Sequence, residues 1–237
     1  MLLKDKVIIV FGGSGLIGKE IVKDIEKKGG IAINADINSE DYKVDITNND
    51  DIKNLFKNVF DKYGKIDGVV NSAYPRTKDW GNKLEDVQFE SWQKNVNMQL
   101  NPIITITQEG LKYMKEGSSF VNFGSIYGVC GNDFTIYEGT GGTSPAAYPA
   151  IKAGIINFTR YLASYVGHKG IRANCVSPGG VFDNQNPLFV KNYSHRSPLK
   201  RLARAEEMAP AVSFLLSDEA SYITGHNLMV DGGWSAI

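Results

Sequence analysis

The sequence predicts an α/β protein with a single domain built on a doubly wound parallel sheet of about seven strands. Short β-branched runs alternate with longer helical patterns, which is typical of right-handed βαβ units. The chain has 237 residues, of which 42% are hydrophobic, enough for one sizeable core. A glycine-rich turn follows the first strand-like run and begins the first helical pattern, as in Rossmann-type folds. We therefore expect one domain over residues 1–237.

Strands are expected where short runs rich in β-branched or aromatic residues occur. These runs are 6–11, 31–35, 42–44, 67–71, 118–124, 171–177 and 227–230. The apolar spacing of helices occurs in five segments, which are 16–28, 50–63, 89–115, 145–168 and 206–216. Two polar, glycine- or proline-containing stretches, at about 126–147 and 182–202, are expected to be loops. Both begin at the carboxyl end of a strand, where open α/β sheets bind ligands, so we expect them to form the walls of a substrate site.

The charge balance and the cysteines argue against several classes of partner. Lysine plus arginine equals aspartate plus glutamate at 26 each, so no overall field attracts nucleic acid or an anionic membrane. No secretory signal and no run of 18 apolar residues is present, which indicates a cytoplasmic protein. Cys130 and Cys175 lack metal-ligand spacing, and we expect both to be reduced and no metal to be bound.

The glycine-rich turn is a predicted dinucleotide site. Gly12, Gly15 and Gly18 recur at intervals of three where the first helix begins, so the backbone can approach a pyrophosphate and free N–H groups can bind it. Asp36, at the end of the second strand, can accept hydrogen bonds from ribose hydroxyls and would repel a 2′-phosphate. NAD is therefore the expected cofactor. The turn residues expected to contact it are Gly12, Ser14, Gly15, Leu16, Ile17 and Gly18.

Tyr148 and Lys152 form the strongest candidate for chemistry. Their spacing of four places both side chains on one face of a helix, where an ammonium group would favour phenolate and lower the pKa of the tyrosine. Such a tyrosine can act as a general acid or base. Isolated pairs of this kind are usually packing or surface residues. Here the pair is accompanied by the glycine-rich turn, by Ser125 after an apolar run, and by Pro178-Gly179 after another.

From Lys4 to Gly233 the chain resembles the short-chain dehydrogenase/reductase family. The motifs that carry this resemblance occur in family order: Asp45, Asn71-Ser-Ala73, Asn97, Ser125, Tyr148-x-x-x-Lys152, Pro178-Gly179 and Val230-Asp-Gly-Gly233. The resemblance implies that Tyr148 is the catalytic acid/base and that Lys152 binds the nicotinamide ribose. It implies that Ser125 orients the reacting oxygen and that Asn97 holds a relay water. It also implies cofactor contacts from Asp45, Ile46, Asn71, Ser72, Ala73, Tyr148, Lys152, Pro178, Gly179 and Val181.

The predicted substrate site is unusual in its length and polarity. Ser125 and Tyr148 lie 23 positions apart, wider than is usual in the family, and the intervening residues suit a polyhydroxylated ligand. Arg76 could bind an anion through its guanidinium group. The candidate substrate contacts are Arg76, Tyr127, Tyr137 and Asn184. These segments resemble the flagellin-modification and surface-sugar branch of the family, which implies an acidic or nucleotide-linked sugar, such as an activated nonulosonic acid.

Taken together, these features predict an NAD-dependent oxidoreductase that interconverts a secondary alcohol and a ketone on a sugar derivative. Two alternatives stay open: an epimerase or dehydratase with tightly held NAD, suggested by the glycine spacing, and a dinucleotide-binding regulator without turnover. Phe11, Tyr74 and Gly180-Val-Phe182 depart from the family pattern. By resemblance we expect a homotetramer or homodimer that pairs helices 89–115 and 145–168 and the segment 222–237.

Overall fold

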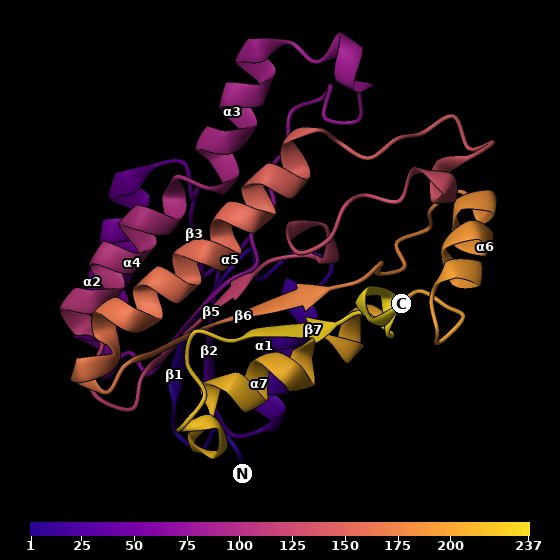
Figure 1. Ribbon diagram of the computed structural model, residues 1–237. Coiled ribbons are helices and arrows are strands. Elements are labelled where there is room, and N and C mark those ends of the chain that lie inside the picture. The colour runs from indigo at the N-terminus through magenta and orange to yellow at the C-terminus, as the bar shows by residue number, and fades with distance from the viewer.

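The computed structural model describes residues 1–237 and contains one seven-stranded sheet (Figure 1). All strand pairs are parallel, and the order is β3-β2-β1-β4-β5-β6-β7. The strands are β1 (Val7–Phe11), β2 (Ile31–Asp36), β3 (Tyr42–Lys43), β4 (Gly68–Asn71), β5 (Ser119–Phe123), β6 (Arg172–Pro178) and β7 (Asn227–Val230). Each expected strand is present, and the predicted Rossmann-type architecture is confirmed.

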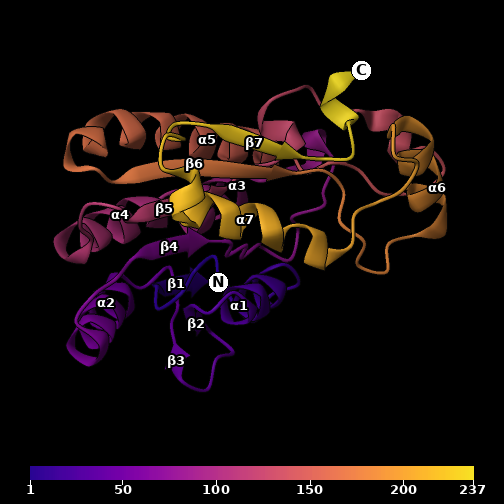
Figure 2. The ribbon, with the colours of Figure 1, turned by 90° about the horizontal axis from the view of Figure 1, so that it is seen from below.

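Helices cover both faces of this sheet (Figure 2). One face packs against α1 (Gly18–Lys27) and α7 (Ala209–Leu216), and the other against α2 (Asn49–Tyr63), α4 (Pro102–Tyr113) and α5 (Ala147–Val166). Side chains of one strand alternate between the two layers, because successive Cβ atoms point to opposite faces. Ile9 and Phe11 join the core under α2, whereas Ile8 and Val10 join the core under α1. None of the helices combines the length and apolarity needed to cross a membrane.

The segment 89–115, expected as one helix, is two helices. The first, α3 (Phe89–Gln99), ends before Leu100 and Asn101, and α4 begins at Pro102. Proline has no N–H group and its ring clashes with the carbonyl four residues earlier, so it suits a first helical turn and breaks an interior one. This proline explains the break. It also lets α3 extend away from the sheet at the end where the ligand is expected (Figure 1).

The segment 182–202, expected as a loop, contains helix α6 (Pro187–Arg196). The side chain of Asn186 accepts a hydrogen bond from the Leu188 N–H at 2.8 Å, and Pro187 occupies the first helical position. An asparagine cap followed by proline is a helix start signal, which the polarity of the segment obscured. The segment 126–147 contains the short 3₁₀ turns η2 (Ile126–Gly128) and η3 (Phe134–Tyr137) and ends where α5 begins at Ala147.

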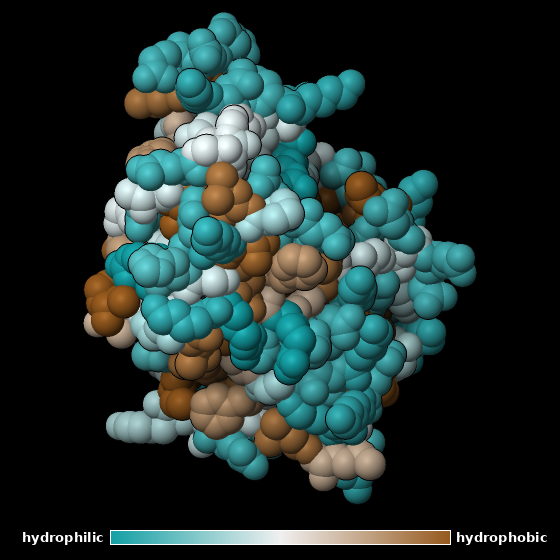
Figure 3. Space-filling model, turned by 90° about the vertical axis from the view of Figure 1, so that its right-hand side faces the viewer, coloured by the Kyte–Doolittle hydropathy of each residue, from teal (hydrophilic) through white to brown (hydrophobic).

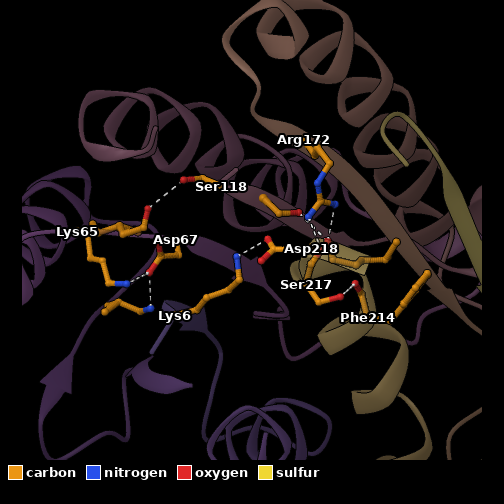
Figure 4. A network of polar contacts seen from close by, with 12 residues as sticks. Lys6, Lys65, Asp67, Ser118, Arg172, Phe214, Ser217 and Asp218 are labelled. Carbon is orange, nitrogen blue, oxygen red and sulfur yellow. Dashed lines mark hydrogen bonds and ion pairs between the residues drawn. The ribbon is translucent and has the colours of Figure 1, made fainter. Parts of the chain in front are cut away.

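A polar network holds together the amino-terminal edge of the sheet (Figure 4). Buried Arg172, at the start of β6, donates to the carbonyl oxygens of Leu215 at 2.7 Å and Ser217 at 2.9 Å. Asp67, beside the start of β4, accepts from the Val7 N–H at 2.7 Å and so joins β4 to β1. These bonds satisfy backbone groups that would otherwise be buried without partners. The opposite, carboxyl-terminal edge is free to present side chains to a ligand.

Candidate active site

The turn after β1 has the shape of a backbone cradle. Gly12 has φ +76°, and a Cβ atom there would lie 2.6 Å from the Cα of Ala73. A Cβ on Gly18 would lie 2.0 Å from the Gly12 carbonyl oxygen, so only glycine fits at either position. No side chain caps the N-terminus of α1, and the N–H groups of Leu16, Ile17 and Gly18 donate to no group of the protein, so they are free for an anion. The structure thus brings Gly12, Ser14, Gly15, Leu16, Ile17 and Gly18, the residues expected to contact a pyrophosphate, into one turn.

Asp36 lies beside this turn. One of its carboxylate oxygens accepts from the Ser14 N–H at 3.2 Å, which fixes the charge next to the glycines. Asp45 is exposed, and its carboxylate accepts from the Thr47 N–H at 2.8 Å, whereas its neighbour Ile46 is buried. Both acidic side chains follow strands at the carboxyl edge of the sheet, Asp36 at the end of β2 and Asp45 after β3.

The end of β4 closes the other side of the turn. The Ser72 N–H donates to the Phe11 carbonyl at 3.0 Å, and the Ser72 hydroxyl donates to the same oxygen at 2.8 Å. Ala73 packs against Gly12. Asn71 is buried and its Oδ1 has no hydrogen-bond partner within the protein. A buried acceptor without a partner indicates a place for an ordered water or a ligand group.

Ser125, Tyr148 and Lys152 come together where β5 ends against α5. Ser125 is buried, and its hydroxyl oxygen accepts from the Tyr127 N–H at 3.2 Å, which leaves its proton free for donation. The Ser125 hydroxyl lies close enough to the phenol of Tyr148 to act on its pKa. Lys152 is buried and donates from Nζ to the Phe123 carbonyl at 2.9 Å. Its ammonium group lies 5.8 Å from the centre of the Tyr148 ring.

The structure corrects the expected protonation of Tyr148. Burial raises its pKa above the ordinary value, and the hydrogen bond from Ser125 only partly opposes this effect. Burial also lowers the pKa of Lys152 to about 8. The expected depression of the tyrosine pKa by Lys152 is therefore not found, because desolvation of the phenolate is the larger effect. At pH 7 Tyr148 is a neutral phenol, the form that donates a proton.

Asn97 does not join this group. It is exposed on α3, and its carboxamide oxygen accepts from the Asn101 side chain at 2.8 Å. Asn97 lies five residues beyond Trp92, which turns it away from the face of α3 that packs on α5. Its side chain therefore meets Asn101 and solvent, and its expected role in holding a relay water stays a prediction.

Gln99 is a buried carboxamide on the inner face of the same helix. It follows Trp92 by two helical turns, and only 3% of its surface is exposed. Neither its Nε2 nor its Oε1 has a partner. The next residue, Leu100, packs against Gly154 of α5, two positions after Lys152. The helical spacing from Trp92 was the signal in the sequence that could have identified Gln99.

The end of β6 is held by Tyr193 of α6. The Gly180 N–H donates to the Tyr193 hydroxyl at 2.5 Å, and a Cβ on Gly179 would lie 2.7 Å from that same oxygen. Val181 forms an isolated parallel bridge with Ala203. Pro178, Gly179 and Val181 therefore lie on a backbone segment fixed by α6, at the edge where the other candidate cofactor residues gather.

A shallow cavity of about 380 Å³, open to solvent, lies between the two segments expected to be substrate walls. It is lined by Tyr137, Thr140, Gly142, Gln185, Asn186 and Phe189. The rings of Tyr137 and Phe189 are 5.3 Å apart, and Asn192 of α6 donates to the carbonyls of Ile136 and Glu138, which joins the walls. Apolar side chains lie among hydrophilic ones near the centre of the face that carries α6 (Figure 3). Aromatic rings combined with amide and hydroxyl groups suit a polar ring-shaped ligand.

The other candidate substrate residues lie in different surroundings. Tyr127 is buried beside Trp234, with ring centres 6.5 Å apart and its hydroxyl without a partner. Asn184 is exposed and has φ +55°. Arg76 is exposed, with its guanidinium carbon 5.3 Å from the centre of the Tyr74 ring. Of the four candidates, only Tyr137 lines the cavity.

Known proteins share this fold over nearly the whole chain. A family model described as enoyl-(acyl carrier protein) reductase matches residues 17–235. A post-translational flagellin modification protein A from Campylobacter coli is 36% identical, over 98% of this chain and 99% of that protein. A short chain dehydrogenase from Leptospira borgpetersenii, solved with bound NAD+, has a TM-score of 0.87 at 36% identity and covers 98% of this chain and 94% of its own. Thermoplasma acidophilum aldohexose dehydrogenase has a TM-score of 0.86 at 27% identity, with coverages of 99% and 95%.

These matches define the class of the protein. The chain belongs to the short-chain dehydrogenase/reductase family and is an oxidoreductase.

Proposed function

We propose that the protein is an NAD-dependent oxidoreductase that interconverts a secondary alcohol and a ketone on a sugar derivative. The observation that carries this proposal is the convergence of Ser125, Tyr148 and Lys152 at the strand edge that also bears the glycine cradle and Asp36. The NAD+ bound to the Leptospira borgpetersenii relative supports the cofactor. The carboxylate of Asp36 beside Ser14 supports NAD over NADP, because it would repel a 2′-phosphate.

The residues divide the chemistry between them. Bound nicotinamide supplies or accepts the hydride at the reacting carbon. Tyr148, a neutral phenol at pH 7, donates its proton to the ketone oxygen during reduction and becomes a phenolate. In the oxidation direction it must first lose its proton to solvent, and the phenolate then takes the proton of the alcohol. Ser125 donates a hydrogen bond to the same oxygen. Lys152, buried and linked to Phe123, offers its remaining N–H donors to the ribose hydroxyls.

Gln99 takes the role that the resemblance assigned to Asn97. A buried carboxamide without any partner needs a hydrogen-bonding molecule, and an ordered water satisfies it at low cost. Leu100 and Gly154 bring this end of α3 against α5 close to Lys152 in the chain. We assign to Gln99 the binding of a water through which the proton on Tyr148 exchanges with solvent.

A sugar substrate in surface glycan biosynthesis is supported by the cavity and by two relatives. The cavity pairs the rings of Tyr137 and Phe189 with the amides of Gln185 and Asn186. The names of the Campylobacter coli and Thermoplasma acidophilum relatives refer to flagellin modification and to an aldohexose.

The test is a screen of sugars, including CMP-linked nonulosonic acids, for stoichiometric change in nicotinamide absorbance at pH 7. Turnover of 3-oxoacyl thioesters but of no sugar would contradict the substrate class, and product without net NADH would indicate an epimerase or dehydratase.

Arg76 supports an acidic sugar. Its guanidinium group is exposed and has no carboxylate partner in the protein, so it is free to pair with an anion. Arg76→Ala should raise KM for an acidic sugar by about tenfold, or ~1.4 kcal/mol, without changing KM for a neutral analogue. Arg204→Ala is the matched control, because Arg204 is exposed but paired with Glu206. Equal effects of both variants would remove the support for an anionic substrate.

We also propose a homotetramer or homodimer that pairs α5 across a two-fold axis. Tyr161 and Tyr165 are exposed on α5 at 60% and 56%, and their rings stack at 5.9 Å. Exposed aromatic groups of this kind mark association surfaces. Light scattering should give an oligomer for the wild type and a smaller species for Tyr161→Ser/Tyr165→Ser. A monomeric wild type at all concentrations would contradict the assembly.

A further inference from the structure

Tyr74 and Trp80 surround the ring of Tyr148. The ring centres of Tyr74 and Tyr148 are 5.7 Å apart with an interplanar angle of 68°, and those of Trp80 and Tyr148 are 6.2 Å apart at 88°. Tyr74 and Trp80 also contact each other, at 5.9 Å and 81°. Every pair is edge to face, the arrangement that aromatic quadrupoles favour. The two flanking rings come from the loop after β4, whereas Tyr148 belongs to α5.

The Tyr74 ring also contacts the ammonium group of the pair. Lys152 Nζ lies 5.4 Å from the centre of the Tyr74 ring and 5.8 Å from that of Tyr148. Both distances are within the range over which an aromatic face attracts a cation. Tyr74 therefore contacts both Tyr148 and Lys152, to which the proposed reaction assigns roles. A tyrosine at position 74 is one of the departures of this chain from the family pattern.

The loop that carries these rings is anchored to α3. Asn95 is 2% exposed, and its side chain donates to the Thr77 hydroxyl at 2.8 Å while it accepts from the Thr77 N–H at 3.1 Å. The Ser91 hydroxyl donates to Asp79 at 2.7 Å. Trp80 packs against the cluster formed by α4 and α5. The two rings thus project from a segment held by hydrogen bonds and by packing, which is what a positioning element requires.

We propose that Tyr74 and Trp80 are positioning residues that hold the Tyr148 phenol in one orientation toward Ser125. This inference rests on the proposed acid/base role of Tyr148. A group that transfers a proton to one oxygen must keep a fixed direction, and a misplacement of about 1 Å can cost 10²-fold in rate. Two edge contacts on one ring restrict its rotation, and the Tyr74 face also keeps the Lys152 ammonium beside it.

The kinetic test compares Tyr74→Phe, Tyr74→Gly and Trp80→Ala. Tyr74→Phe keeps the ring and should retain kcat within about twofold. Tyr74→Gly and Trp80→Ala should lower kcat by about 10- to 100-fold with little change in KM, because they free the phenol without removing it. Tyr113→Leu is the control, because Tyr113 packs at 5.1 Å from the Phe60 ring on α2, at the far end of α4. It should lose a similar amount of packing but retain kcat.

A second measurement needs no substrate. Site-selective ¹³C labelling of tyrosine, with Tyr148→Phe used to assign the signal, reports how fast the Tyr148 ring flips. Its flip rate should rise at least about tenfold in Tyr74→Gly and stay near the wild-type value in Tyr74→Phe and Tyr113→Leu. An unchanged flip rate in Tyr74→Gly, or a rise in KM alone, would overturn the positioning role. An active Tyr148→Phe enzyme would instead contradict the proposed function and leave the ring measurement interpretable.

Discussion

The Lys152 ammonium group donates a 2.9 Å hydrogen bond to the carbonyl oxygen of Phe123, and this bond ties α5 to the end of β5. Phe123 precedes Ser125 by two residues, so the same bond sets how Ser125 lies relative to the helix that carries Tyr148. Lys152 has no carboxylate partner, and burial lowers its pKa to about 8. Burial of this ammonium group therefore lowers the free energy of unfolding, by an amount that depends on pH.

The free energy of unfolding should depend on pH because folding lowers the pKa of Lys152. Its pKa falls from 10.5 to about 8 on folding, so between these values the unfolded chain binds more protons and folding stability rises with pH. Compared with Lys152→Met, the wild type should gain about 2 to 3 kcal/mol between pH 7 and pH 10. Urea unfolding of both proteins at the two pH values measures this difference. Parallel changes in the two proteins would show that Lys152 titrates normally.

Asp36 should set the cofactor preference. Its carboxylate accepts from the Ser14 N–H at 3.2 Å beside the glycine-rich turn, and in the proposed function it repels a 2′-phosphate bound there. We expect NADH to bind more tightly than NADPH by several kcal/mol, about 2 or more. Asp36→Ala should narrow that preference, chiefly by improving NADPH binding. Fluorescence titration with NADH and NADPH measures both affinities, and tighter binding of NADPH by the wild type would refute the assignment of NAD as the cofactor.

Tyr148→Phe should remove turnover and preserve cofactor binding. The ring contacts with Tyr74 and Trp80 remain, but the proton donor is lost. The expected loss in kcat is about 10²- to 10⁴-fold, with NADH affinity nearly unchanged. Steady-state kinetics and NADH titration on the same preparation separate the two effects. Near-native activity would mean that another group transfers the proton.

Gln99→Leu and Asn97→Leu should behave differently. Gln99 is buried with both amide atoms unpartnered, so leucine should leave stability within about 1 kcal/mol while the relay water loses its partner. We expect kcat to fall by about tenfold or more in Gln99→Leu. Exposed Asn97 contacts only Asn101, and Asn97→Leu should leave kcat unchanged. A larger loss of kcat in Asn97→Leu than in Gln99→Leu would instead indicate that Asn97 binds the relay water.

Arg172→Leu should destabilise the fold without affecting the site. Two charged hydrogen bonds to the carbonyls of Leu215 and Ser217 would be lost, and these buried oxygens would have no replacement donor. The expected cost is about 2 to 4 kcal/mol in urea unfolding, with unchanged NADH affinity. Asp218→Asn removes the neighbouring ion pair with Lys6. The Asp218 side chain is 81% exposed, so this change should cost under about 1 kcal/mol. Similar costs for both would contradict this account of the network in Figure 4.

Local sequence patterns predicted all seven strands but missed the break between α3 and α4 and the start of α6. Strands β1, β4, β5 and β6 are buried along their whole length, as expected where both faces of a parallel sheet are covered. Strands β2, β3 and β7 are only partly buried, and their short runs were still sufficient to predict them. The break before Pro102 and the helix begun by Asn186 and Pro187 are also local signals, but the longer patterns around them obscured both. Asn97 was chosen for its residue type and order, whereas the inner face of α3 carries Trp92, Val96 and Leu100, and it is Gln99 that is buried.

The sequence by itself determined the fold class, the glycine cradle, the acidic residue beside it, and the serine, tyrosine and lysine of the candidate site. These depend on short-range rules, because a helix places residues four apart on one face and a turn that needs positive φ selects glycine. Only the tertiary structure decided the pKa values of Tyr148 and Lys152, the burial of Gln99, and the contacts of Tyr74 and Trp80 with the phenol. Desolvation and ring packing depend on neighbours distant in the chain, and no local pattern records which of them will meet.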